Sequence, residues 1–486
     1  MLSIITFVPL LGALLIAALP RTAVSTMRLV AMLAALASFI GSLGVLFNFD
    51  PTHAGYQFIE AAVWIPQHGI GYKVGVDGVS IWLLMLTTFL FPIVIAASAG
   101  AIHEREKEYY ALMLLMETAT LGVFLALDMF LFYVFWEFAL VPMYFIIGIW
   151  GGARRVYASI KFFIYTMAGS ALMLVAILFM GVTAGTFDLE QLAAQNSVWS
   201  ANTLLFLAFA IAFIIKVPLF PFHSWLPDAH TEAPTPGSVI LAAVLLKMGA
   251  YGLIRFNLSL FPEASRQLAP LMIALSVIGI LYGAIVAFAQ SDAKRLIAYS
   301  SVSHMGYIVL GIFSLNQLGV QGALLQMINH GLSTGGLFMM IGYLYERRHT
   351  REMARLGGIW AQMPLYGALM LIFVLSSAGL PALNGFVGEF VILQGAFQAN
   401  PLWTAFAVLG MVLSAVYLLT FFQKIFLGES RDAANDTLTD INRSEVLAVA
   451  PLIVLCFVIG LYSLPFFNAM SASVNNLLAA VGVVMR

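Results

Sequence analysis

Apolar segments long enough to cross a membrane follow one another along almost the whole chain of 486 residues. A helix needs about 20 apolar residues to span the hydrocarbon core of a bilayer. Hydropathy indicates fourteen such segments, near residues 3–19, 28–47, 78–100, 110–127, 129–150, 160–184, 203–226, 237–256, 270–289, 296–315, 320–345, 364–396, 402–426 and 446–467. Because backbone polar groups inside a bilayer must be hydrogen-bonded within the protein, this pattern predicts an all-α polytopic membrane protein with about 14 transmembrane helices.

The composition narrows the functional classes. Hydrophobic residues make up 62% of the chain, charged residues only 9%, and the formal net charge is −1. These values exclude a soluble globular domain and any role in binding nucleic acid. The single cysteine, Cys456, excludes thiolate metal sites and iron–sulfur clusters. No histidine pair or glycine-rich loop matches a metal or nucleotide motif, so we expect this chain to bind neither a metal nor a cofactor.

Lysine and arginine are distributed unevenly among the predicted loops. The loops on one side hold Arg21, Arg105, Lys107, Arg154, Arg155, Lys294, Arg295, Arg347, Arg348, Arg351, Arg355, Arg431 and Arg443. The loops on the opposite side hold little beyond Lys73 and Arg266. Basic loops of membrane proteins face the cytoplasm, and an even number of spans then puts both termini on the outer side.

Two of the fourteen segments contain helix breakers. In the seventh segment and just beyond it, Lys216 is followed by Pro218, Pro221 and Pro227. Proline removes a backbone donor and clashes with the carbonyl four residues back, so this helix must break or kink. The twelfth segment contains Gly379, Pro381, Gly385 and Gly388. Non-helical backbone is tolerated at membrane depth only where protein or water satisfies it, so both breaks indicate a polar interior.

The two breaks occupy matching places in two blocks of five segments. Each interrupted segment is the fourth of its block, in segments 4–8 and 9–13. Such a layout is typical of transporters with inverted repeats, so we expect two inverted five-helix repeats with broken helices 7 and 12. The predicted organisation is an N-terminal three-helix segment at 1–108, a first repeat at 109–257, a second repeat at 268–427, and a C-terminal loop with a last helix at 428–486.

Three ionisable residues lie inside apolar segments: Glu137 in MFLFYVFWEFALVPMYF, Lys216 in LLFLAFAIAFIIKVPLF and Lys247 in GSVILAAVLLKMGAYG. Each has a plainer interpretation, because a buried carboxyl can stay neutral or make a structural hydrogen bond and a lysine can extend its ammonium to the headgroups. Both lysines lie too deep for that, and two buried lysines favour an ion pair with Glu137. Ionisable groups at membrane depth usually face an interior or a water-filled cavity, so we predict a proton or ion path.

Weaker candidates follow in the second block. His304 shares a helical face with hydroxyl groups in SSVSHMGY, and His330 continues a polar stripe in QMINHGLSTGG. A lone buried histidine is more often structural, but two of them on successive spans suit a proton relay. Glu389 follows the break in the twelfth segment. There it can cap the N-terminus of a half-helix, act as a proton carrier exposed to water on the outlet side, or do both.

Two further sets of ionisable residues are weaker candidates for the proton path. Lys424 lies near the end of the thirteenth segment, where it can extend to the headgroups. Four ionisable residues follow the first break: His223, Asp228, His230 and Glu232. Their spacing matches no metal template, so a gating or structural role is favoured over metal binding.

The chain resembles the antiporter-like membrane subunits of respiratory complex I and of Mrp-type sodium/proton antiporters. The resemblance is carried by KVPLFPFHSWLPDAHTEAPTPGSVILAAVLLKMG, SSVSHMGY and NHG, and it covers nearly the whole chain. Within this family the M-type subunits of NADH:quinone oxidoreductase are most similar, through GVDGVSIWLLMLTTFLFPI, WEFALVPMYFIIGIWGG and the acidic Glu389. The related L and N subunits and the Mrp homologue typically carry lysine at that last position.

The resemblance implies a role for each candidate residue. Lys216 is the expected central proton carrier and Glu137 the partner that modulates it. Lys247, His304 and His330 are expected to link two half-channels, with Glu389 as the terminal carrier. Electron transfer, with FMN, iron–sulfur clusters and quinone, is expected in other subunits. The implied partners are L-type and N-type membrane subunits, lipids and protons, and the implied location is the bacterial inner (plasma) membrane.

Three other functional classes stay open at this point. The same lysine–glutamate machinery serves a secondary sodium/proton antiporter, which Glu389 in place of lysine disfavours. A homologous subunit of a membrane-bound hydrogenase is poorly separated by sequence. A non-catalytic scaffold is disfavoured, because it gains nothing from the desolvation cost of charges on several separate helices.

Overall fold

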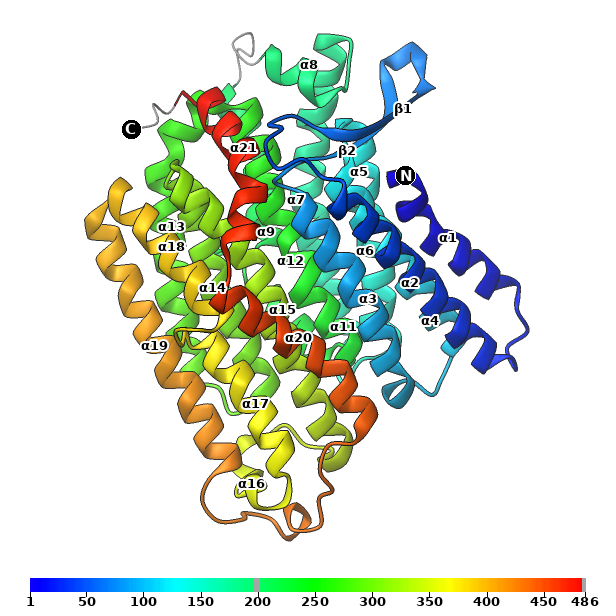
Figure 1. Cartoon of the computed structure of the whole chain (residues 1–486), viewed down its shortest axis with the longest axis vertical. Coiled ribbons are helices and arrows are strands. Elements are labelled where there is room, and N and C mark those ends of the chain that lie inside the picture. The colour runs from blue at the N-terminus through cyan, green and yellow to red at the C-terminus, as the bar shows by residue number, and fades with distance from the viewer. Residues whose placement is uncertain (196–201, 483–486) are drawn as a thin grey trace. The chain divides into compact units, whose positions relative to one another are not determined.

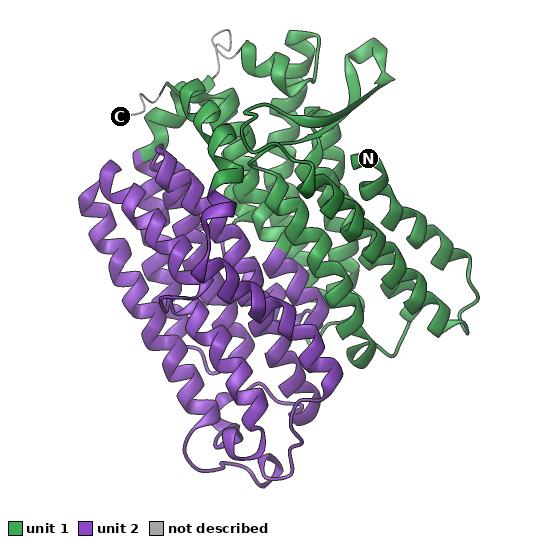
Figure 2. Ribbon diagram, viewed as in Figure 1, with its two compact units in different colours: residues 1–217, 244–269, 468–486 green, residues 218–243, 270–467 purple. Residues whose placement is uncertain are grey.

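The computed structural model describes residues 1–195 and 202–482. These residues are largely helical, with one two-stranded hairpin among them (Figure 1). The chain divides into two compact units (Figure 2). Unit 1 comprises residues 1–217, 244–269 and 468–486, whose last four residues lie outside the described part, and unit 2 comprises residues 218–243 and 270–467.

Unit 1 contains the N-terminal helices, the hairpin and part of a later span. Its elements are α1 (Leu2–Ala18), α2 (Val24–Phe47), β1 (Gln57–Ile65), β2 (Ile70–Val76), α3 (Ile81–Ala101), α4 (Glu106–Leu125), α5 (Met129–Phe138), α6 (Leu140–Trp150), α7 (Arg155–Ala184), α8 (Leu189–Ala194), α9 (Asn202–Lys216), α12 (Leu246–Gly252) and most of α21 (Leu464–Ala480). The helix α12 has a π-helical turn on each side, at Leu241–Leu245 and Leu253–Leu258.

Unit 2 contains the remaining helices. They are α10 (Trp225–Glu232), α11 (Thr235–Ile240), most of α13 (Pro262–Phe288), α14 (Ala293–Phe313), α15 (Gln317–Arg348), α16 (Ile359–Gln362), α17 (Pro364–Ser377), α18 (Asn384–Ala399), α19 (Pro401–Phe426) and α20 (Arg443–Leu461). Within this unit α15 packs against α14, α17, α18 and α20.

Hydropathy and burial agree with a polytopic membrane protein. Ten helices among the described residues are long and apolar enough to cross a membrane, and α1, α9 and α17 are shorter apolar helices. The apolar windows of α2 and α20 are only 33% buried, so most of their apolar surface is free to face lipid. By contrast, the window of the helix at Thr235–Leu258 is 100% buried. The predicted class of all-helical membrane protein is confirmed at this level.

The observed helix ends differ from the predicted segment boundaries at both predicted breaks. The predicted segment 203–226 ends early, because α9 stops at Lys216 and the chain turns at the prolines that follow. The predicted segment 364–396 consists of α17 and α18, separated by residues 378–383. The hairpin and α21 were not predicted. Helix α21 follows α20 after two residues and has Pro465 in its first turn, where proline is tolerated. Hydropathy therefore does not separate the start of α21 from the predicted segment 446–467.

The hairpin ties several helix ends of unit 1 together. β1 pairs antiparallel with β2, and the backbone of Lys73 in β2 accepts a hydrogen bond from Leu127, directly after α4 (2.9 Å). The Lys73 ammonium donates to Asp188 and Glu190, both at 2.6 Å. Partial burial by itself would lower the pKa of Lys73. The hydrogen bonds to the two carboxylates have the larger combined effect and raise this pKa.

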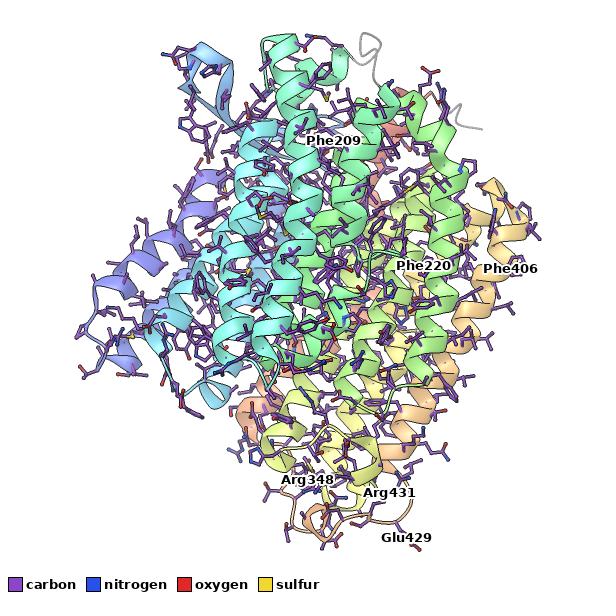
Figure 3. The ribbon with its side chains drawn as sticks, turned by 180° about the vertical axis from the view of Figure 1, so that it is seen from behind. Phe209, Phe220, Arg348, Phe406, Glu429 and Arg431 are labelled. Carbon is purple, nitrogen blue, oxygen red and sulfur yellow. The ribbon has the colours of Figure 1, made fainter. Side chains whose placement is uncertain are left out.

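Basic residues at one end of unit 2 are held by ion pairs and loop carbonyls. Figure 3 shows Arg348, Glu429 and Arg431 at the same end of this unit. Arg348 pairs with Asp432 at 2.9 Å, and Arg431 donates to the carbonyl of Met353 at 3.3 Å. These contacts connect the loop between α15 and α17 with the loop between α19 and α20.

A buried ion pair joins the residue after β2 to the end of the helix that contains α12. Arg255 donates to Asp77 through both terminal nitrogens, at 2.8 and 2.5 Å, and both side chains are less than 10% exposed. Tyr56 and Tyr251 complete the contacts of the guanidinium at 3.1 and 3.0 Å. Tyr56, Asp77 and Arg255 line a cavity of about 270 Å³.

The loss of Asp77 leaves a buried cation without its counter-ion. We expect Asp77→Ala to lower the free energy of unfolding by about 3–5 kcal/mol. Thermal unfolding of the detergent-solubilised protein measures this, with Asp436→Ala in an exposed loop as the control. Adding Arg255→Met should recover much of the loss, because an apolar replacement of a buried pair is often neutral. An unfolding temperature of Asp77→Ala equal to that of the control would show that the pair contributes little.

Candidate functional site

Each compact unit contains its own group of candidate ionisable side chains. The cluster of unit 1 includes the buried Lys216 and Lys247 and the partly exposed Glu137, and the cluster of unit 2 includes the buried His304, His330 and Glu389. All six were predicted from the sequence. Their environments differ, because the two lysines lie beside interrupted or π-helical backbone whereas the residues of unit 2 contact one another.

Lys216 is the last residue of α9 and is only 1% exposed. Its Nζ lies 5.3 Å from the ring centroid of Trp136 and 5.5 Å from that of Phe162. Among the described residues, no group forms a hydrogen bond with this Nζ. The ammonium therefore rests on aromatic faces, which stabilise a cation less than a carboxylate contact does.

Glu137 lies one residue before the C-terminal end of α5 and is partly exposed on this chain. Its carboxyl interacts with Ser170 and Tyr133, and electrostatically with Lys216. Ser170 is held in turn by Trp136, whose Nε1 donates to the hydroxyl at 3.0 Å. Because Lys216 Nζ has no hydrogen bond in the described part of the chain, the two charges interact through space and not as a contact ion pair.

Lys247 lies in α12 and is fully buried. Gly249 and Gly252 on this helix allow the close approach of α9: a Cβ atom at Gly249 would lie 2.6 Å from the carbonyl oxygen of Phe213, and one at Gly252 would lie 2.4 Å from its ring. The flanking π-helical turns are a feature that is common at functional sites. They leave α12 as a short regular helix that presents Lys247 inside unit 1.

Glu389 of α18 forms the centre of the cluster in unit 2. One carboxylate oxygen lies 2.6 Å from Nδ1 of His304 on α14 and accepts a hydrogen bond from Gln326 on α15 at 3.0 Å. Gly388 makes this approach possible, because a Cβ there would lie 2.3 Å from the Gln326 side-chain oxygen. The glutamate is 1% exposed, so its carboxyl is shielded from solvent and contacts these two side chains instead.

The hydrogen bonds continue beyond His304. The hydroxyl of Tyr417 lies 3.4 Å from Nε2 of His304 and 2.6 Å from the hydroxyl of Ser300. The rings of His304 and His330 have centroids 6.0 Å apart. A row of exchangeable protons therefore runs from Ser300 through Tyr417 and His304 to Glu389.

Two expectations about Glu389 were wrong. It was expected to be exposed to water on the outlet side, but it is buried against His304 and Gln326. It was alternatively read as a cap, but α18 begins at Asn384, so Glu389 lies beyond the first turn. Sequence spacing located the carboxylate near the break but could not show which helices cover it.

Several buried ionisable residues were missed. Glu117 in α4 is fully buried, and the Asp77–Arg255 pair and Lys294, which donates to the carbonyl of Ala233, are less than 10% exposed. The signal for Glu117 was present, because it is an acidic residue inside an apolar segment as Glu137 is. Asp77 and Lys294 lie near the ends of predicted segments, where a charge is ordinarily solvated.

The remaining candidates lie outside the two clusters. Lys424 is exposed in the last turn of α19, in agreement with a side chain that extends to the headgroups. The loop predicted after the first break forms α10, and His230 stacks on Phe338 with ring centroids 4.4 Å apart. Over residues 1–195 and 202–482, no group of three or more histidine, cysteine or acidic side chains could hold a metal ion.

Comparisons with known proteins identify the family. Residues 126–414 match the family described as NADH:quinone oxidoreductase/Mrp antiporter, TM, and residues 57–127 match NADH-ubiquinone oxidoreductase chain 4, amino terminus. NADH-quinone oxidoreductase subunit M of Rhodobacter capsulatus is 45% identical, over 98% of this chain and 96% of the relative.

Solved structures give the same result. A chain of respiratory complex I from Thermus thermophilus with bound NADH superposes with a TM-score of 0.91 at 34% identity, covering 99% of this chain and 100% of that chain. A chain of the Mrp complex from Dietzia shares the fold, with a TM-score of 0.88 at 21% identity and 99% coverage of both chains. The chain therefore belongs to the subunit M group of the NADH:quinone oxidoreductase/Mrp antiporter family.

Proposed function

We propose that this chain is a proton-translocating membrane-arm subunit of NADH:quinone oxidoreductase, driven by redox chemistry in other subunits. The observation that carries the proposal is the buried row Ser300–Tyr417–His304–Glu389, in which each step is a hydrogen bond or a close polar contact. If Glu389 and His304 formed only a structural ion pair, the contacts of His304 with the hydroxyl of Tyr417, and of Tyr417 with that of Ser300, would not be needed. Lys216, held by aromatic rings and by a through-space carboxylate, is the matching proton-binding group of unit 1.

The chemistry of each cluster follows from its contacts. In unit 2 a proton moves along the short contact between Glu389 and His304: an O–H bond breaks as an N–H bond forms, and the carboxyl and imidazole become carboxylate and imidazolium. In unit 1 the ammonium of Lys216 keeps its proton while the charge of Glu137 is close, and it releases the proton when that charge is withdrawn or neutralised. Lys247 and His330 would connect these events.

The proposed membrane layout comprises fourteen spans in two inverted five-helix repeats. The first repeat, 109–257, contains the interruption after α9, and the second, 268–427, contains the interruption between α17 and α18. Residues 1–108 form the N-terminal three-helix segment and 428–486 the C-terminal loop and last helix. Both termini would lie on the outer side of the bacterial inner membrane, since the basic loops then face the cytoplasm.

The proposed setting is a larger complex. As a subunit of an oxidoreductase with translocase activity, this chain would work beside L-type and N-type membrane subunits. FMN, iron–sulfur clusters and quinone would be bound elsewhere, which is compatible with the single cysteine, Cys456, buried in α20. A secondary sodium/proton antiporter is the alternative, and the glutamate at position 389 disfavours it.

Lys216→Ala removes the proposed proton carrier of unit 1. We expect proton translocation and coupled NADH:quinone turnover to fall by roughly tenfold or more, the scale on which acid–base groups contribute, while the complex still assembles. Lys216→Arg should fail as well, because arginine is effectively never deprotonated in a protein. Lys424→Ala, at an exposed lysine, is the matched control. Wild-type proton translocation by an assembled Lys216→Ala complex would contradict the carrier role.

Glu137 and Lys216 should behave as one unit. Because the two charges interact, the double variant Glu137→Gln/Lys216→Met should lose less complex stability than the sum of the two single losses, by about 0.5–3 kcal/mol. Thermal unfolding of the assembled complex measures the difference. Strict additivity would mean that the two side chains do not influence one another.

Glu389→Gln tests the carrier in unit 2. Glutamine preserves the shape and can still bond to His304 and Gln326, but it cannot bind and release a proton. We expect proton translocation in reconstituted vesicles to fall by roughly tenfold or more. Glu389→Lys should retain part of the activity, since the family resemblance implies lysine at this position in the L, N and Mrp subunits. Glu263→Gln, at an exposed position, serves as the control. If the Gln variant translocates protons normally, Glu389 has only a structural role.

A further inference from the structure

Glu117 is a buried acid that the proposed path does not use. It lies in the middle of α4, its side chain is 0% exposed, and neither carboxyl oxygen has a hydrogen-bond partner among the described residues. A buried polar group without a partner costs roughly 1–3 kcal/mol, and a buried charge costs more. A side chain that contributes only to packing would gain nothing from this carboxyl, so the surroundings of Glu117 indicate its role.

Helices α4 and α12 run in the same direction inside unit 1. The C-terminal end of α4 is fixed at the hairpin, because the residue after it, Ala126, pairs with Val74 of β2. The helix that contains α12 ends at the same place, because Arg255 binds Asp77, the residue directly after β2. Both helices therefore point their C-terminal ends toward the hairpin, and they pack against each other.

A contact between Tyr251 and Phe124 shows which faces of α4 and α12 lie against each other. The hydroxyl of Tyr251 donates to the carbonyl of Phe124 at 3.1 Å, and the two rings meet edge to face with centroids 5.3 Å apart. Glu117 precedes Phe124 by seven residues, about two turns, so it lies on the same face of α4. Lys247 precedes Tyr251 by four residues, so it lies on the same face of α12.

The opposite face of α12 confirms this orientation. Gly249 and Gly252 lie against α9, where Phe213 leaves no room for a side chain. At 100° per residue these glycines point away from the stripe formed by Lys247 and Tyr251. The lysine is therefore directed away from α9 and toward α4.

The axial positions match as well. At a rise of about 1.5 Å per residue, Glu117 lies about 10 Å before Phe124, and Lys247 lies about 6 Å before Tyr251. The two Cα atoms are therefore offset by only about 4–5 Å along parallel helices whose axes are about 8–10 Å apart. The four-carbon stem of a lysine and the two-carbon stem of a glutamate are long enough to bridge that gap.

We propose that Glu117 is the proton-exchange partner of Lys247. In the exchange, an N–H bond of the Lys247 ammonium breaks and an O–H bond forms on the Glu117 carboxylate, so that a charged pair becomes a neutral amine and a neutral carboxyl. The reverse step reloads the lysine. Before and after each step the two groups are either both charged or both neutral, so no single charge is left uncompensated in the apolar interior. The pair can therefore hold a proton between transfers. The inference rests on the proposed function, because it gives Lys247 the counterpart that Glu137 provides for Lys216.

The test uses the assembled complex in vesicles, with Glu117→Gln, Glu117→Asp and the neighbouring control Thr118→Val, which removes a buried hydroxyl on another face of α4. We expect Glu117→Gln to lower proton translocation by about tenfold or more, Glu117→Asp to retain a substantial part, and Thr118→Val to match the wild type. Lys247→Met should be equally impaired, and adding Glu117→Gln to it should cause no further loss. Equal function of Glu117→Gln and wild type, or additive losses in the double variant, would overturn the proposal.

A second measurement does not depend on turnover. Infrared difference spectra of the complex, recorded with and without NADH, should contain a carboxyl band that disappears in Glu117→Gln and remains in Thr118→Val. Persistence of every carboxyl band in Glu117→Gln would overturn the proposal even if that variant assembles poorly. The proposed function fails separately: if Lys216→Ala and Lys247→Met both translocate protons normally, that function is wrong. If both are impaired while Glu117→Gln is normal, only the role of Glu117 is wrong.

Discussion

The loss of hydration on burial constrains every ionisable side chain inside the apolar helices, because a charge at membrane depth is costly unless neighbouring groups compensate it. The chain meets this constraint in different ways. Arg255 and Asp77 compensate each other through two hydrogen bonds and two tyrosines, and the carboxyl of Glu389 contacts His304 and Gln326. Lys216 has only aromatic faces and a through-space charge. The Arg255–Asp77 pair, in which the two charges bond to each other, favours one charge state. Lys216 Nζ and one carboxyl oxygen of Glu389 have no hydrogen-bond partner among the described residues, so these two groups can change theirs.

The same constraint explains why backbone irregularities accompany the candidate residues. Lys216 ends a helix, Lys247 lies between two π-helical turns, and Glu389 follows the interruption between α17 and α18. Regular helices bury their backbone groups completely and so present no polar surface to a side chain. Interrupted ones expose carbonyl and amide groups at membrane depth, which must be satisfied by protein or water. Buried ionisable residues and irregular backbone therefore occur in the same places along this chain.

The sequence predicted structure correctly where a residue type does not fit the segment around it, such as a charge in an apolar run or a proline in a helix. Apolar runs located the helices, prolines after Lys216 located the end of α9, and charges in apolar runs located Glu137, Lys216 and Lys247. The pairing of Glu389 with His304 was not predictable, because it depends on how closely α18 approaches α14 and α15, which Gly388 permits. The hairpin was missed because its strands, of nine and seven residues, are shorter than a membrane span and lack a long apolar run. Asp77 was missed because its partner lies 178 positions away.

The hairpin has a consequence for the chemistry of unit 1. It fixes the C-terminal ends of α4 and of the helix containing α12 at one level, through Ala126 and Val74 on one side and Arg255 and Asp77 on the other. Helices that are fixed at one end keep their relative register along their length. Glu117, two turns before Phe124 on α4, then faces Lys247, one turn before Tyr251 on α12. A structural ion pair outside the proposed path therefore determines which proton-binding groups can meet within it.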